Sequence, residues 1–172
     1  KNFSKNTEYE IILYNNILLL SRNELFYTKF NLSDTFQNRI ILIFIHVSFL
    51  FIKIRTEKEK DKYEVFYQNV FDVIFKNIEV NMREIGYGDV TINKNMKSLV
   101  KTFYNILLYC EKFTKETSSS KKDFLIKYLE QKTDQKNLNN TGLINYFNLY
   151  QAFCLDLSSD SVLKGVLNFK YK

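Results

Sequence analysis

Hydrophobic residues recur at helical spacing along most of this chain, and proline is absent from it. Repeated 3.6-residue periodicity without proline predicts helices rather than strands. The pattern therefore predicts an all-α fold, a single-domain helical bundle of about six to eight helices that spans residues 1–172. The expected helices cover about residues 7–22, 34–55, 60–85, 92–115, 120–131 and 143–155, with a short helix or turn over 23–32 and a last short helix near 158–160.

Side chains that can cap a helix mark several of these starts. Pairs with capping-box character are Thr7–Glu10, Asp34–Gln37 and Ser120–Asp123. A cap near Ser158 would begin the last helix, which Gly165 should weaken. Polar connections are expected over 56–62, 117–120 and 133–142.

The segment from Arg39 to Arg55 is apolar nearly all round, as in a helix at the centre of a bundle or in a membrane. Its uncharged run, 40–52, has about 13 residues, whereas a bilayer span needs about 20. We therefore predict a core helix, central together with the 60–85 helix. Replacing Phe44 or Ile45 with Ala should cost about 2–5 kcal/mol.

Three basic positions of that helix, Arg39, His46 and Lys53, are spaced seven residues apart and share one face. One interpretation is a polar seam whose groups are all hydrogen-bonded. The other is a cationic line that opens to a partner. The sequence leaves both open.

Two glycines of only four lie in the turn at 86–89. Gly86 is placed for a left-handed helix C-cap, and Gly88-Asp89 makes a second break. Thr91 or Asn93 would cap the next helix. The use of two of the four glycines in one turn predicts a fixed turn that presents Asp89 and the lysines after it.

The 92–115 helix is two-faced. Its core side carries apolar residues, and the opposite side carries Lys94, Lys97, Lys101 and Lys112, with Leu108 near them. The lysines are either a solvated face or a docking surface beside the turn. Solvation alone does not explain Leu108.

Composition and charge limit the partners and the kinds of chemical site that this chain can have. The net charge of +6 and the pI near 9.1 favour acidic partners such as RNA, anionic lipid or acidic protein. Cys110 and Cys154 have no metal or disulfide spacing and are expected to be buried thiols. No phosphate-binding glycine loop or catalytic triad is visible, so we expect no enzyme activity, no metal and no cofactor. The chain opens with Lys1, which leaves room for a removed targeting segment.

Two blocks resemble one known family. Leu32 to Phe51, containing Asp34, Arg39 and His46, resembles the opening motif of the ubiquinol–cytochrome c chaperone family. The segment 83–89, REIGYGD, is similar to its second motif, together with Lys94, Lys97 and Phe103-Tyr104. The likeness runs from about Tyr9 to Phe113, with a weaker helical tail to about Asn168. Where the family continues with Gly-Arg, this chain has Asn105-Ile106, so any contact of that Arg is lost or moved.

The resemblance implies a non-enzymatic assembly chaperone for respiratory complex III, associated with newly made cytochrome b. Its expected partners are cytochrome b or another complex III subunit, and a partner assembly factor or ribosome. The expected location is the matrix side of the mitochondrial inner membrane, or the bacterial cytoplasm at the inner membrane. The alternatives are a helical RNA- or ribosome-binding module and a peripheral membrane adaptor.

The predicted partner-binding residues fall in two groups. The first surrounds the glycine turn: Arg83, Gly86, Gly88, Asp89, Lys94, Lys97, Lys101 and Leu108. The second is the line of Arg39 and His46, with Lys53. Lysines would speed association electrostatically, and Leu108 would add apolar contact.

Overall fold

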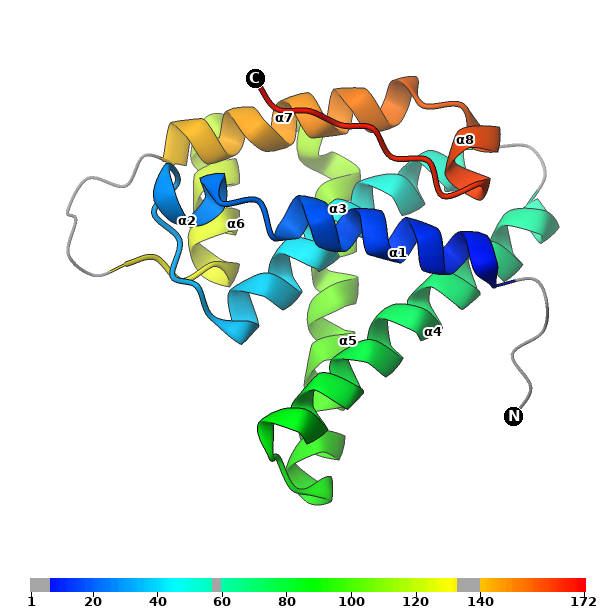
Figure 1. Ribbon diagram of the computed structural model, residues 1–172. Coiled ribbons are helices and arrows are strands. Elements are labelled where there is room, and N and C mark those ends of the chain that lie inside the picture. Colours follow the sequence, from blue (N-terminus) through cyan, green and yellow to red (C-terminus); the bar gives the residue numbers. More distant parts are fainter. Residues whose placement is uncertain (1–6, 57–59, 133–139) are drawn as a thin grey trace.

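Helix α3 (Phe36–Arg55) runs through the middle of the protein and is buried on nearly all sides. The computed structural model describes residues 7–56, 60–132 and 140–172, and over these it is all-α (Figure 1). This confirms the predicted single-domain helical bundle. The other elements are α1 (Glu8–Ser21), α2 (Leu25–Thr28), α4 (Lys60–Ile85), α5 (Asp89–Lys112), the 3₁₀ helix η1 (Phe113–Lys115), α6 (Ser118–Tyr128), α7 (Asn140–Asp156) and α8 (Ser159–Leu163).

Four helices, α1, α4, α5 and α7, pack against α3, and α8 contacts it as well. The prediction that α4 is also central is wrong. It buries one face against α1, α3 and α5, and its C-terminal end projects with the start of α5 away from the other helices (Figure 1). The α4–α5 turn is therefore the most protruding feature built from described residues.

Helix α3 is long and apolar enough to cross a membrane by length and composition, and its most apolar window is 78% buried inside the domain. Surrounding helices supply the apolar environment that such a surface requires. The assignment to the core is thus confirmed within the described residues.

Several predicted helix starts need correction. Thr35, not Asp34, caps α3, accepting a hydrogen bond from the Asn38 amide at 3.1 Å. Thr7 stands at the N-cap of α1 but makes no capping hydrogen bond with its side chain. A hydroxyl from Thr or Ser satisfies an N-terminal amide as well as a carboxylate does, so neighbouring candidates cannot be ranked by residue type.

The starts of the later helices can be compared with the prediction in the same way. Thr117 caps α6 through the Ser120 amide, so the expected loop over 117–120 is already the first turn of that helix. Ser158 caps α8 as predicted. Helix α7 begins at Asn140, within the expected linker. The rest of that linker, 133–139, and residues 57–59 of the first connection lie outside the described residues.

Buried Asn38 ties two distant segments together. Its Nδ2 donates to the Ser33 and Glu130 carbonyls, each at 2.7 Å, and its Oδ1 accepts from the Glu130 amide at 2.8 Å. Beside it, Leu32 and Gln131 form an antiparallel β-bridge. The Glu130 hydrogen bonds and the β-bridge hold the segment after α6 against the start of α3 and the residues before it.

Gly165 has a role that its place in the sequence did not indicate. Its φ is +74°, and the Gly165 and Val166 amides return to Val162 and Ser161, which ends α8 in a Schellman motif. A Cβ here would lie 2.7 Å from the Tyr9 carbonyl oxygen. Gly165 thus ends α8 and lets the C-terminal segment lie directly on α1.

Phe44 tests the core assignment. Its ring is fully buried and lies 5.3 Å from that of Phe103 and 5.5 Å from that of Phe75, measured between centroids. We expect Phe44→Ala to lower the free energy of unfolding by about 3–5 kcal/mol, because it leaves a cavity. Leu19→Ala is the control, since Leu19 is 70% exposed. Equal effects of the two substitutions in urea unfolding would contradict the placement of α3.

Candidate functional site

The α4–α5 turn is built on Gly86. Its φ is +102°, a conformation that costs glycine little. The Tyr87 amide returns to the Met82 carbonyl at 3.1 Å, and the Gly86 amide to the Arg83 carbonyl at 3.0 Å. These two bonds form a Schellman motif, so the predicted left-handed C-cap is confirmed.

Gly88 behaves differently. It is the N-cap of α5, with φ −73° and ψ 159°, which any residue can adopt. The helix starts at Asp89, so Thr91 and Asn93 lie inside it and the prediction that one of them caps it is wrong. Because φ at Gly88 is negative, Gly88→Val should not strain the backbone there.

Arg83 closes the turn. Its guanidinium donates to Asp89 at 2.6 Å across the turn and to Glu79 at 3.0 Å along α4. These hydrogen bonds, Asp89 first, raise the pKa of Arg83. The carboxylate of Asp89 therefore pairs with Arg83 across the turn, while its side chain stays 78% exposed.

Apolar side chains cover the projecting end of this hairpin. Ile85 is 55% exposed, Tyr87 43% and Val90 84%. They were not among the residues predicted from the sequence, although apolar residues beside turn glycines are an available signal. We call these three residues the apolar tip.

One side of α5 is basic and exposed. Positions three or four residues apart share a helix face, and here they form what we call the α5 row: Lys94, Lys97, Lys101, Asn105, Leu108 and Lys112, all exposed. From Val90 to Cys110 the sequence contains no Asp or Glu. The structure thus brings the predicted lysines and Leu108 together on one surface beside the turn.

The row ends at a groove between α5 and α6 with a volume of about 780 Å³. Leu108 lies on its lining and is 57% exposed. Tyr109 and Phe124 stack at the groove with centroids 4.0 Å apart. Packing of α6 beside α5 therefore places this exposed leucine at the edge of a groove.

The line of Arg39, His46 and Lys53 is not a free cationic surface. Arg39 forms an ion pair with Asp34 at 2.8 Å, and Lys53 donates to the Leu155 carbonyl at 2.9 Å. His46 is fully buried. This arrangement agrees with the polar-seam interpretation, and no described surface exposes His46 to a partner.

Both ring nitrogens of His46 are used. Nδ1 lies 2.6 Å from the Leu42 carbonyl oxygen, which can only accept, so Nδ1 carries the proton. Nε2 then accepts from the Tyr146 hydroxyl at 2.8 Å. Burial lowers the pKa of His46 to about 4, partly offset by the Leu42 hydrogen bond. The ring is therefore neutral and structural at physiological pH.

Cys110 and Cys154 are buried free thiols, as predicted. Burial raises the pKa of Cys154 to about 12 and that of Cys110 further. Thiolates are therefore strongly disfavoured at both positions. Within the described residues, no group of three or more His, Cys, Asp or Glu could hold a metal ion.

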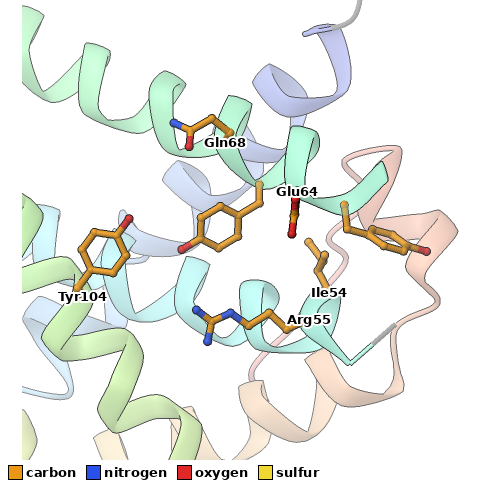
Figure 2. Close-up of a pocket in the computed structure, with 7 residues that line it drawn as sticks. Ile54, Arg55, Glu64, Gln68 and Tyr104 are labelled. Carbon is orange, nitrogen blue, oxygen red and sulfur yellow. The ribbon is translucent and has the colours of Figure 1, made fainter. Parts of the chain in front are cut away.

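A second open pocket lies where the end of α3, the start of α4 and α5 meet, with a volume of about 650 Å³. Figure 2 shows Ile54 and Arg55 from α3, Glu64 and Gln68 from α4, and Tyr104 from α5 around it. Its described lining also includes Tyr63 and Tyr67 but no His, Cys or Ser. The Arg55 guanidinium pairs with Glu111. The described lining therefore holds one carboxylate, Glu64, and three tyrosines, but no Ser–His or Cys–His pair.

Known proteins resemble this chain over most of its length. The family model described as ubiquinol-cytochrome C chaperone matches residues 28–169. A crystal structure described as the Cbp3 homolog from Brucella abortus is similar, with a TM-score of 0.80 and 20% identity over 96% of this chain and 91% of that one. At this identity the likeness concerns the fold. None of the curated proteins compared with the chain matches it.

The two turn glycines can be separated by mutation. Gly86→Ala should lower the free energy of unfolding by about 1–2 kcal/mol, because an L-residue is strained at positive φ. Gly88→Ala should change it by less than about 0.5 kcal/mol, since its backbone is unstrained and a Cβ there would meet no atom within 4 Å beyond its chain neighbours. Chemical denaturation of both variants measures this. Equal losses would contradict the turn geometry.

His46 should make stability depend on pH. The unfolded chain binds a proton below its usual pKa near 6.5, whereas the folded ring does so only near 4. The contribution of His46 to the free energy of unfolding is therefore fully present above pH 6.5. It is lost as the pH falls toward 4, by about 2 kcal/mol between pH 7 and pH 5. In His46→Gln this part of the dependence of the free energy of unfolding on pH should vanish, although the variant is less stable at every pH. An unchanged slope in urea titrations would assign the effect to other groups.

Proposed function

This chain belongs to the ubiquinol–cytochrome c chaperone family, and from that membership we propose that it is a non-enzymatic assembly chaperone for cytochrome b maturation and the ubiquinol–cytochrome c reductase complex. The observation that carries the proposal is the family match over residues 28–169. The described residues support it in a second way, since they offer exposed contact surfaces rather than an enclosed catalytic site.

Two features suit a docking role. A chaperone for an incompletely assembled protein needs exposed apolar contact residues and polar rims that keep it soluble. The apolar tip supplies the first, with Val90 84% exposed. The lysines of the α5 row supply the second. We propose that the Gly86–Asp89 turn and the α5 row form the docking site, with Arg83 and Asp89 holding the turn in shape.

The proposed partners are cytochrome b or another complex III subunit, together with a partner assembly factor or the ribosome. The proposed location is the matrix side of the mitochondrial inner membrane, or the bacterial cytoplasm at the inner membrane. A lysine face beside an apolar tip also suits peripheral contact with anionic lipid. That contact would be compatible with chaperone activity at the membrane.

Deleting the gene tests the function. We expect assembled complex III to fall, because cytochrome b would not mature, while the other respiratory complexes stay near normal. Native gels and absorbance spectra of membranes measure both. Re-expression of the wild-type chain is the control and should restore complex III. Normal complex III in the deletion strain would refute the assignment.

A pull-down from respiring membranes with mass spectrometry identifies the partner. Recovery of cytochrome b or another complex III subunit would support the chaperone assignment. Recovery of ribosomal RNA without these subunits would favour the RNA-binding alternative. Sedimentation with lipid alone would favour a peripheral membrane adaptor.

A further inference from the structure

The α5 row gathers four lysines along one exposed face of a single helix. Arg39, Arg55, Arg83 and Lys164 each form an ion pair with an acidic residue. Within the described part of the chain, no ion pair involves the lysines of the row. Three of them, Lys94, Lys97 and Lys101, lie in the acid-free stretch between Val90 and Cys110. Their charge is therefore not compensated by neighbours on their own helix.

The row has a defined length and spacing. From Lys94 to Lys112 there are 18 residue steps, which at 1.5 Å per step make about 27 Å. A second α-helix lying along α5 repeats its side chains at the same rise. Carboxylates spaced three or four residues apart on such a helix would meet the successive lysines in register.

The groove at the end of the row has aromatic residues on one side, and hydrogen bonds and ring contacts fix their positions. The Tyr109 hydroxyl bonds to Ser120 Oγ at 2.9 Å, and Ser120 Oγ donates to Glu116 at 2.6 Å. Phe124 lies against Tyr109 on one side and 5.3 Å from the Tyr128 ring on the other. Together with Leu108, these rings give the groove an apolar wall against which one large apolar side chain can pack. The remaining lining is polar and includes Asp123 and Lys127.

We propose that the α5 row and the α5–α6 groove together bind an acidic amphipathic helix of a partner protein. Its carboxylates face Lys94, Lys97 and Lys101, and an apolar side chain beyond them enters the groove beside Leu108. Charge complementarity selects the acidic face, and the groove sets the position along the helix. The inference rests on the proposed function only in making the partner a protein.

The row is a poorer match to nucleic acid or lipid. Its cations are all lysines, which act as point charges, and no arginine is present for planar contact with phosphate. No aromatic residue lies among the six of the row, whereas single strands are bound by stacked aromatic platforms. A bilayer would gain nothing from a groove placed at one end of the lysines.

The probe is a labelled synthetic peptide of about 18 residues, long enough to follow the row. It carries Glu at helical spacing on one face and Phe beyond the last Glu. The control peptide has Gln in place of each Glu. Stopped-flow anisotropy across a range of salt concentrations gives both rate constants. We expect the Glu peptide to bind more tightly than the Gln peptide, most strongly at low salt.

Variants separate charge from apolar contact. K94E/K97E should slow association about tenfold at low salt and flatten its salt response. Leu108→Ala should mainly speed dissociation, leaving the salt response unchanged. The matched control is K170E/K172E, which makes the same charge change on the exposed C-terminal segment and should alter association far less. Circular dichroism checks that each variant is folded.

Each of the following results would overturn the proposal. One is equal binding of the Glu and Gln peptides, or equal effects of K94E/K97E and K170E/K172E. The other is binding that requires Lys94 and Lys97 only with phosphatidylglycerol vesicles or a uridine oligonucleotide. A peptide that fails to bind, with complex III still reduced in the deletion strain, would remove this inference and leave the proposed function standing.

Discussion

Burial of α3 on nearly all sides is the constraint on which the rest of the structure depends. An apolar helix of this length must be enclosed by other apolar surfaces, and α1, α4, α5 and α7 provide them. Each surrounding helix packs one face against α3, which leaves its opposite face for solvent or for a partner. The exposed face of α5 is therefore a consequence of how α3 is covered.

Polar groups inside α3 select which segments cover it. Buried polar atoms without a partner cost about 1–3 kcal/mol each, and Asn38 and His46 find partners far along the chain, at Glu130 and Tyr146. Ser48 bonds within the helix, to the Phe44 carbonyl. Apolar packing alone would tolerate other arrangements of the C-terminal half. The long-range hydrogen bonds of Asn38 and His46 make the observed arrangement specific.

Some charged side chains on the surface pair with each other, whereas others are available to a partner. Arg83 and Asp89 pair with each other across the turn, whose shape is defined by the backbone hydrogen bonds around Gly86. The lysines after it have no such pairing among the described residues. A rigid turn next to uncompensated charge and exposed apolar side chains is suited to contacting another protein, which connects the local geometry to the proposed chaperone role.

By itself, the sequence determined the features that depend on local rules. Periodicity identified α3 as a core helix and placed the lysines on one face, and the conformational freedom of glycine identified the C-cap at Gly86. Tertiary structure alone decided that the Asp89 carboxylate turns back to Arg83, that Asn38 joins two segments, and that Leu108 borders a groove. The reason is physical. Helical spacing and backbone preference act over a few residues, whereas hydrogen-bond partners and grooves arise only when segments distant in sequence pack together.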